Sequence, residues 1–327
     1  MSTVIPSLST LKPFLRQFEH SQIKKALWQL LNTLIPYFFL WWVMLRLYQI
    51  NPWLVIPVAF IAAGFLARIF IFFHDCGHQS FFNSQKANQI VGFFLGLLTL
   101  TPSEHWWKSH AIHHSTMGNL DKRGIGDVET ITLNEYRRRT SFGKLQYRLY
   151  RHPIVMFLLG PFFVFFLRQR VPIPWLNKKA GFSVILVDLL IVLALIISHN
   201  TIGILPFIMI QSVTLYITGI AGIWLFYVQH QFPEVYWARN NQWDYVAAAY
   251  KGASYYHLPK VLQWFTGNIG FHHIHHLRPR IPNYLLDKCY QSTLLFQNNI
   301  QKLDLRSSLR CMKLALYDEE KHRLVGF

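Results

Sequence analysis

Most of the 16 histidines in this 327-residue sequence fall into short groups. Three of these groups share a spacing of three or four residues between imidazoles. Their members are His74 and His78 in HDCGH, His110, His113 and His114 in HAIHH, and His272, His275 and His276 in HHIHH. Residues three or four apart lie on one face of a helix, so each group directs its imidazoles the same way. We predict that the three faces meet around bound metal.

The number of imidazoles indicates which kind of metal site this is. Eight histidines exceed the four ligands of a tetrahedral zinc ion, so the sequence predicts two metal ions. His230, in FYVQHQF, is a ninth candidate. Four carboxylates, those of Asp75, Glu104, Asp121 and Asp127, are candidates for orienting the ligands by hydrogen bonds. His105 and His273 lie outside the repeated spacing, and we predict that neither binds metal. Imidazole alone leaves zinc, copper, iron and nickel open.

Long apolar segments surround the histidine groups. Hydrophobic residues make up 52% of the sequence and charged residues 14%, against roughly 25% charged in a typical soluble chain. Residues 28–48, 52–73, 182–198 and 202–228 are each apolar enough and long enough to cross a bilayer. We therefore predict an all-α integral membrane protein with four transmembrane helices in two hairpins. Shorter apolar runs at 90–100 and 153–167 are expected to dip into the bilayer or lie along it, and six crossings remain an alternative.

The excess of basic residues predicts the topology. The formal net charge is +17, yet the short connections at 49–51 and 199–201 contain no Lys or Arg. By the positive-inside rule, both termini and the long middle segment are cytoplasmic. The histidine groups then lie on that side, within a helical cytoplasmic cap. Residues 1–27 contain no signal peptide, and the basic residues require no nucleic-acid partner.

A metal site beside a bilayer suggests an apolar substrate. Removing hydrogen from an unactivated carbon requires iron and dioxygen rather than a zinc-bound water, so this chemistry favours iron. Trp106 and Trp107 precede the second histidine group, and we expect them to seat that segment against the bilayer, as interfacial tryptophans do.

The three histidine groups and the sequences around them resemble a known family. HDCGH, HAIHH and HHIHH, in this order around two pairs of predicted spans, resemble the three histidine boxes of the membrane fatty acyl desaturases. GNLDKRGIGDVETITLNEY, WLFYVQHQF and GNIGFHHIHHLRPRIPNY resemble the bacterial and cyanobacterial acyl-lipid branch, which contains delta-12 (omega-6) enzymes. The resemblance covers roughly residues 35 to 300.

This resemblance implies two iron ions, held by the eight box histidines and His230, with dioxygen as co-substrate. It implies a cis double bond introduced into the fatty acyl chain of a membrane lipid. The animal-type branch of the family has an asparagine that reaches iron through water, and this suggests Asn268, although at a different place in the chain, as a residue behind the ligands. The desaturase domain would span residues 28–300, between a cytoplasmic N-terminal segment, 1–27, and a cytoplasmic C-terminal tail, 301–327. The expected location is a bacterial plasma membrane or a thylakoid.

The resemblance also implies a separate electron donor, a ferredoxin or a b-type cytochrome. The sequence contains no His-Pro-Gly-Gly heme motif, and a basic cytoplasmic face would suit an acidic ferredoxin.

Two other functions remain open from the sequence. A related di-iron hydroxylase or ketolase would use the same ligands and insert oxygen. A membrane metal transporter would place its ligands inside the spans, near the middle of the bilayer.

Overall fold

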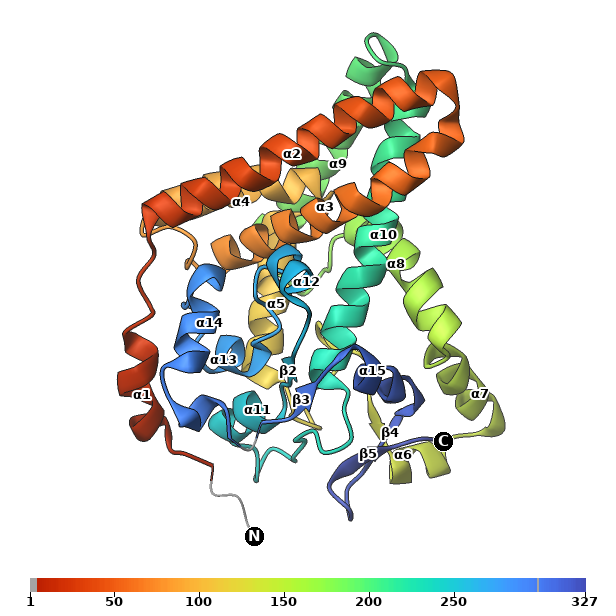
Figure 1. Cartoon of the computed structure of the whole chain (residues 1–327). Helices are drawn as coiled ribbons and strands as arrows, with labels where there is room; N and C mark the ends of the chain where they lie inside the picture. Colours follow the sequence, from red (N-terminus) through yellow and green to blue (C-terminus); the bar gives the residue numbers. More distant parts are fainter. Residues whose placement is uncertain (1–4, 299) are drawn as a thin grey trace.

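Four long helices dominate the computed structural model, which describes residues 5–298 and 300–327 (Figure 1). They are α2 (Ile23–Ile50), α3 (Val55–Gly77, preceded by the single turn η1, Pro52–Leu54), α9 (Lys178–His199) and α10 (Ile204–His230). Each is long and apolar enough to cross a membrane. The predicted fold class is confirmed, and every predicted span lies within one of these helices or, at its first residues, in the adjoining turn.

The two hairpins pack against each other through α3 and α10. Ala59 and Ala62 of α3 are fully buried beside Ile210 of α10, and small side chains let two membrane helices approach closely. The hydroxyl of Thr218 on α10 donates to the Ala63 carbonyl of α3 over 3.1 Å. The four helices therefore form one bundle rather than two separate hairpins.

The charged residues inside the spans have protein partners. Arg68 of α3 donates from Nε to Thr33 Oγ1 over 3.2 Å, and its guanidinium lies 4.0 Å from the centre of the Trp264 ring. Asp188 of α9 accepts from Arg170 Nη1 over 2.8 Å. These contacts give the charges a structural role, since an unpaired charge inside a bilayer is costly.

The two shorter apolar runs form bent or packed helices. The first belongs to α4 (Gln85–Leu98), which packs on α3. The second follows α7 (Ser141–Tyr150) in the consecutive turns η2 (Val155–Leu159), α8 (Gly160–Phe162), η3 (Phe163–Leu167) and η4 (Arg168–Arg170). The chain bends by 57° between α7 and this run, so the described residues contain four candidate spans, or five if the bent pair counts as one. The alternative of six crossings is not supported.

A cap of short helices continues the bundle at the end of α10 that carries His230 (Figure 1). Its helices are α1 (Leu8–Arg16), α5 (Ser103–Thr116), α6 (Leu133–Arg138), α11 (Tyr245–Lys251), α12 (Lys260–Phe265), α13 (His272–Leu277), α14 (Asn283–Gln291), η5 (Leu294–Phe296), α15 (Leu305–Ser308) and η6 (Leu309–Lys313). Leu11 and Leu15 of α1 are buried against Ile274 and Leu285 of α13 and α14. The short helix α13 is thus enclosed by apolar packing from several elements.

Two small sheets tie the C-terminal residues into this cap. Strands β1 (Ile131–Thr132), β4 (Leu316–Asp318) and β5 (Arg323–Val325) form a sheet in the order β1-β4-β5, in which β1 and β4 are parallel and β4 and β5 antiparallel. Strands β2 (Tyr255–Tyr256) and β3 (Lys302–Leu303) pair in parallel. The sheets contain only a few residues, so the protein remains mainly helical.

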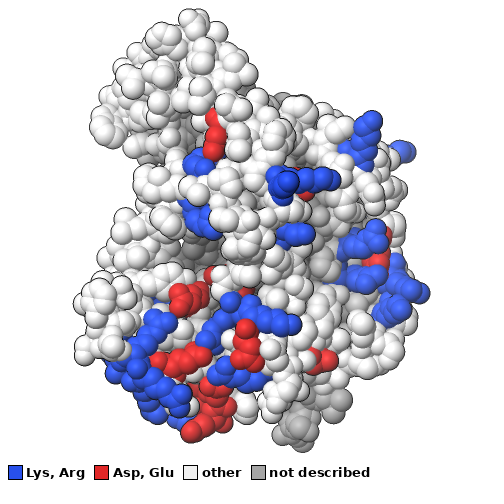
Figure 2. Space-filling view, turned by 180° about the vertical axis from the view of Figure 1, so that it is seen from behind, with Lys and Arg blue, Asp and Glu red and all other residues white. Residues whose placement is uncertain are grey.

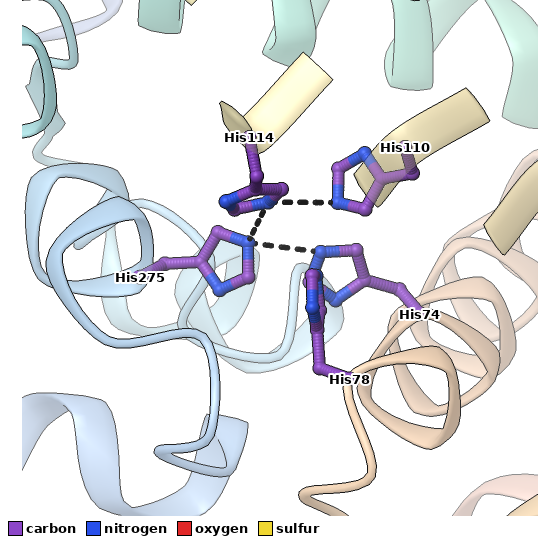
Figure 3. Close-up of side chains that lie close together, drawn as sticks. All are labelled: His74, His78, His110, His114 and His275. Carbon is purple, nitrogen blue, oxygen red and sulfur yellow. Dashed lines mark hydrogen bonds between the residues drawn. The ribbon is translucent and has the colours of Figure 1, made fainter. Parts of the chain in front are cut away.

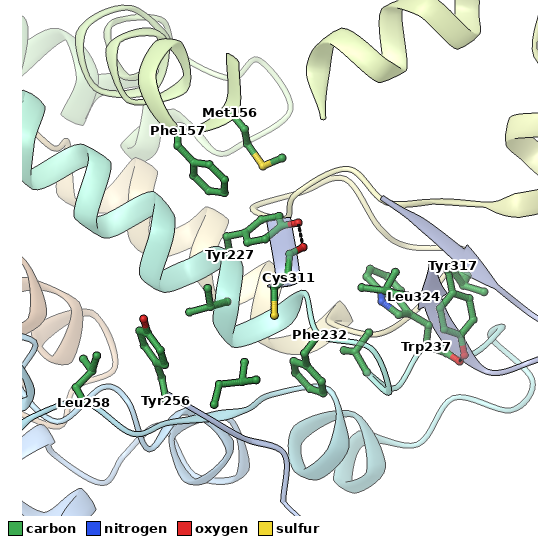
Figure 4. Close-up of a cluster of buried hydrophobic side chains, with 14 residues drawn as sticks. Met156, Phe157, Tyr227, Phe232, Trp237, Tyr256, Leu258, Cys311, Tyr317 and Leu324 are labelled. Carbon is green, nitrogen blue, oxygen red and sulfur yellow. Dashed lines mark hydrogen bonds between the residues drawn. The ribbon is translucent and has the colours of Figure 1, made fainter. Parts of the chain in front are cut away.

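Residues 301–327, expected to be a tail, pack against the end of α10. Cys311, Tyr317 and Leu324 belong to a buried apolar cluster with Tyr227 of α10 (Figure 4). The Tyr227 hydroxyl donates to the Cys311 carbonyl over 2.8 Å. The segment therefore helps to fix the end of α10 that precedes His230. The division of the chain at residues 27 and 300 stays a prediction.

Arg151 joins three parts of the cap, and its loss should destabilise the protein. Its Nη2 donates to Gln231 Oε1 and to the Leu314 carbonyl, both over 2.9 Å, and the side chain is 3% exposed. Arg151→Met would remove three charge-assisted hydrogen bonds, including one from Nη1 to the Glu129 carbonyl over 3.1 Å, at a cost of about 2–4 kcal/mol. We expect the unfolding midpoint of the purified protein to fall by roughly 5 °C. Arg138→Met, at an exposed position on α6, is the control and should leave the midpoint within about 1 °C.

Candidate metal centre

The end of α3 provides the first two histidines. His74 lies in the last turn, and His78 is the C-cap residue, whose N–H donates to the His74 carbonyl over 3.2 Å. The sequence pattern predicted that the helix extends through both residues, and it ends one residue before His78. Their ring centres still lie 4.7 Å apart. The following residue, Gln79, has a φ of 56° and turns the chain away from the site.

The three histidines of helix α5 contact two different sets of residues. His110 and His114 face the α3 histidines, and their Nε2 atoms lie 3.0 Å apart. His113 instead faces α10, with its ring centre 4.9 Å from that of His230. The prediction that all three point the same way is therefore wrong for His113. Adjacent residues on a helix are about 100° apart, so one helix passing between two sites can serve both.

Helix α13 divides its histidines in the same way. His275 Nε2 lies 3.1 Å from His74 Nε2 and 3.0 Å from His114 Nε2. His276 faces the other side, and its ring stacks on that of His114 with centres 4.2 Å apart. His272 Nε2 lies 2.9 Å from His230 Nε2 and 3.1 Å from His276 Nε2.

The nine predicted ligands thus form two adjoining groups, each able to hold a metal ion. The first group contains His74, His78, His110, His114 and His275 (Figure 3), and the second contains His113, His230 and His276. Within each group one ring nitrogen of every residue lies within 4.8 Å of the others. His272 lies outside these limits but adjoins the second group. We name them the first and second histidine groups, and count His272 with the second.

Several ring nitrogens in these groups have no partner. His78 Nε2 and His113 Nε2 are buried without a hydrogen-bond partner, although buried polar atoms are normally satisfied. Elsewhere in the groups Nε2 atoms face each other at about 3 Å, where two imidazole lone pairs repel unless a proton or a metal cation lies between them. Metal ions would satisfy both features, so the residues fit a two-metal centre.

Burial keeps these imidazoles in the form that binds metal. It lowers the pKa of six of them well below the ordinary value of 6.5, and the positive charges that neighbouring imidazoles would carry lower it further. These six are His78, His110, His114, His272, His275 and His276. Neutral imidazole is the metal ligand, so the site is prepared for binding at neutral pH.

Acceptors behind the rings orient them. Asp75 Oδ1 lies 3.1 Å from His74 Nδ1, and Asp127 Oδ1 lies 2.5 Å from His113 Nδ1. The Gly252 carbonyl lies 3.0 Å from His230 Nδ1. A proton held on Nδ1 by such an acceptor leaves the Nε2 lone pair free to bind metal. Asp75 and Asp127 therefore contact a predicted ligand, whereas Asp121 accepts from Arg239 Nη1 over 2.8 Å and Glu104 lines a groove on the outside of the bundle.

Asn268 lies elsewhere, and a different asparagine is next to the site. The side chain of Asn268 donates to the Asn283 carbonyl over 3.2 Å rather than to a histidine. Asn283 was not predicted. Its backbone N–H and its side-chain Nδ2 donate to Asp75 Oδ2 over 2.8 and 2.9 Å, and it also exchanges hydrogen bonds with Gln29 of α2. A buried polar chain thus runs from α2 through Asn283 and Asp75 to His74.

His105 and His273 stay outside both groups, as predicted. The His273 ring donates to the Phe296 carbonyl over 3.1 Å, and burial lowers its pKa to about 3. The backbone N–H of His105 donates to Ser183 Oγ over 3.2 Å. Neither residue therefore contributes a ring nitrogen to either histidine group.

The half-buried rings of Trp106 and Trp107 pack against other parts of the protein, and the expected contact of α5 with the bilayer stays a prediction. The Trp106 ring stacks on His110 with centres 4.4 Å apart. Trp107 stacks on Phe73 and donates from Nε1 to the Phe73 carbonyl over 3.1 Å. These contacts form because α5 packs against both α3 and α9. The two rings form an aromatic layer beside the first histidine group.

The two carboxylates should control different metal ions. Asp75→Ala removes the acceptor behind His74, and Asp127→Ala removes the acceptor behind His113. We expect each change to weaken metal binding at its own group by about 10–100-fold, the usual effect of losing an orienting partner. Metal titrations of the purified variants should show one weakened and one unchanged binding step. Two equally weakened steps in either variant would contradict the separate assignment.

A membrane-embedded helical bundle that presents two groups of buried histidines defines a class of membrane metalloprotein. The fatty acid desaturase family profile matches residues 51–294. The protein is 44% identical to a fatty acid desaturase of Bacillus subtilis over 95% of this chain and 88% of that relative. The chain belongs to the fatty acid desaturase family and is an oxygen-dependent oxidoreductase that acts on acyl chains.

More distant relatives carry more specific names. An sn-1 oleoyl-lipid 12-desaturase of Picosynechococcus is 27% identical over 86% of this chain and 82% of its own length. An sn-2 acyl-lipid omega-3 desaturase (ferredoxin) of Arabidopsis thaliana is also 27% identical, over 72% of this chain and 54% of its own length. These two relatives differ in the position named for the double bond, so equal identity does not select between them.

Proposed function

We propose that the nine histidines hold two iron ions, one in each histidine group. The first iron would be held by His74, His78, His110, His114 and His275, and the second by His113, His230, His272 and His276. The observation that carries this proposal is the pair of adjoining groups, of five and three histidines, within each of which the ring nitrogens lie within 4.8 Å of one another. His272 adjoins the second group through His230 and His276. All-nitrogen ligands are compatible with iron, and the reaction requires a metal that activates dioxygen.

The proposed reaction introduces a cis double bond at the delta-12 (omega-6) position of an acyl chain carried by a membrane lipid. Similarity to the sn-1 oleoyl-lipid 12-desaturases supports the position and the lipid carrier. Two hydrogens leave adjacent methylenes, and dioxygen with two electrons and two protons becomes two waters. The bound irons would supply the dioxygen activation.

Other residues of the chain fix the orientation of the histidine rings and exclude water from them. Asp75, Asp127 and the Gly252 carbonyl hold protons on the Nδ1 atoms of His74, His113 and His230. His74, His113, His230, His272, His275 and His276 are all 6% exposed or less. Exclusion of water protects a strong oxidant from side reactions until an acyl chain is in place.

We further propose that electrons come from a separate ferredoxin or b-type cytochrome at the cytoplasmic face. A relative whose name specifies ferredoxin supports the first of these. Figure 2 shows that the uppermost part of the molecule carries almost no charge, whereas Lys and Arg gather lower down and mix with Asp and Glu. This distribution supports cytoplasmic termini and a cytoplasmic histidine cap, in a bacterial plasma membrane or a thylakoid. Basic residues there would attract an acidic carrier.

Lipid analysis tests this function. The protein is expressed in a host that makes oleoyl lipids and no polyunsaturated lipids, and double bonds are located by gas chromatography and mass spectrometry. We expect an 18-carbon chain with a new double bond at carbon 12. A new bond at another carbon overturns the assigned position, and an oxygenated chain supports the hydroxylase or ketolase alternative. The transporter alternative has no support, because the charges Arg68 and Asp188 inside the spans are paired with protein.

A further inference from the structure

A groove on the outside of the bundle lies close to the first histidine group. It runs between α4, α5 and α9 and has a volume of about 530 Å³, within the range of roughly 300–1,000 Å³ typical of ligand sites. Phe93, Trp107, Phe182 and Leu186 form its apolar walls. Phe182 is 64% exposed, so the groove opens toward the region that the bilayer occupies.

One end of the groove is positively charged. Lys178 and Lys179 line it at the first turn of α9, and neither forms an ion pair within residues 5–298 and 300–327. A helix N-terminus carries a partial positive charge and favours anions, so two lysines and no acid in this turn leave a local excess of positive charge. Glu104, on the opposite wall, offers a hydrogen-bond acceptor.

The charged end lies on the same side of the bundle as the histidine cap. Helix α9 begins at Lys178, and the antiparallel helix α10 ends at His230, so these two residues mark the same end of the hairpin. A ligand with an anionic group at the lysines and an apolar chain along α9 would therefore be oriented as a lipid is in a leaflet. Lysines at this level attract anionic lipid headgroups.

The Trp107 wall of the groove packs on the end of α3 that carries His74 and His78. Trp107 forms a groove wall and stacks on Phe73 with ring centres 5.4 Å apart, and Phe73 precedes His74. A Cβ atom at Gly77 or Gly92 would lie 2.3 or 2.6 Å from the Trp107 ring, so these glycines leave room for the ring there. An acyl chain in the groove would lie against the Trp107 ring, which packs on Phe73, the residue before His74.

We propose that this groove binds the substrate phospholipid, with its phosphate at Lys178 and Lys179 and one acyl chain along Phe93, Phe182 and Leu186. A headgroup that bears hydroxyls, as in phosphatidylglycerol, can also donate to Glu104. This inference rests on the proposed membrane-lipid substrate and adds the place where that lipid docks. The acyl chain passes from the groove toward the histidine groups beside Trp107.

The test compares two pairs of lysine substitutions in the full-length protein. K178A/K179A removes the charged end, and K12A/K24A removes two exposed lysines outside the groove. Retention of phosphatidylglycerol by the purified protein is measured by mass spectrometry, together with iron content and double-bond formation in the host. We expect K178A/K179A to lower retention and product by about tenfold with iron unchanged, and K12A/K24A to match the wild type.

A second variant tests the apolar walls independently of charge. L186W fills the groove, and we expect it to lower product by about tenfold at normal iron content. Unchanged retention and product in K178A/K179A would overturn the proposal. Lost retention with unchanged product would also overturn it, because the bound lipid would then not be the substrate. If the wild type forms no double bond, the proposed function fails, and lipid retention still tests whether the groove binds phospholipid.

Discussion

His275→Gln should abolish desaturation and reduce the bound iron from two ions per chain to one. His275 lies at the centre of the first histidine group, since its Nε2 is 3.1 Å from that of His74 and 3.0 Å from that of His114. Glutamine is similar in length but offers a poorer metal ligand, and its uncharged amide adds no new charge to the buried site. Losing an orienting partner alone costs about 10–100-fold, so we expect loss of a ligand to lower product formation by more than about 100-fold.

His273→Gln is the matched control on the same helix. The His273 ring is buried and donates to the Phe296 carbonyl over 3.1 Å, and a glutamine amide can donate to the same acceptor. We expect normal iron content and product formation within about twofold of wild type. The two variants differ by two positions on α13, so equal effects would show that α13 tolerates no substitution and would remove the evidence for a ligand at His275.

His230→Gln should remove the second iron and leave the first. His230 belongs to no repeated spacing and was placed at the site by its position in the chain. In the structure its Nε2 lies 2.9 Å from that of His272, within the second histidine group. Its Nδ1 donates to the Gly252 carbonyl. We expect one iron per chain and a fall in product of more than about 100-fold, because the reaction needs both ions.

His257→Gln serves as the control for His230→Gln, because its side chain is exposed. It should retain both irons and full activity. Iron content is measured on protein purified without added metal, and product is measured as the new double bond in host lipids. A His230→Gln protein that keeps two irons would exclude His230 as a ligand, and the second group would then have to be completed by another residue.

The sequence predicted the elements that carry the site because its signals were local. Apolar runs of about 20 residues mark spans wherever they occur, and histidines three or four apart mark a helical face. All nine predicted ligands accordingly fall in the two groups. Asp75 directly follows His74 in the chain, whereas Asp127 lies 14 positions from His113 and reaches it only because the chain turns back after α5.

The division of the histidines between two groups could not be predicted from spacing. His113 and His114 are adjacent in sequence but face different groups, which depends on how α5 lies between α3 and α10. Asn283 contacts Asp75 from 208 positions away in the chain, and no local pattern distinguishes a buried asparagine from a surface one. Asn268 was wrongly favoured because it lies near His272 in sequence, although its side chain points to the Asn283 carbonyl.

The aromatic residues show the same limit. Tryptophans are typical of an interfacial aromatic belt, and the sequence gives no sign that Trp106 and Trp107 pack against neighbouring side chains. Their contacts with His110 and Phe73 are set by tertiary packing. Likewise, the C-terminal residues look like a tail, yet Tyr317 and Leu324 are 2% exposed.

The central claim is that the two histidine groups hold two iron ions, and metal analysis of the purified full-length protein tests it most directly. The protein is expressed in iron-supplemented medium, purified in detergent without chelators, and analysed by inductively coupled plasma mass spectrometry alongside a quantitative amino-acid analysis. We expect two irons per chain and negligible zinc or copper. One iron per chain, or zinc in place of iron, would contradict the claim.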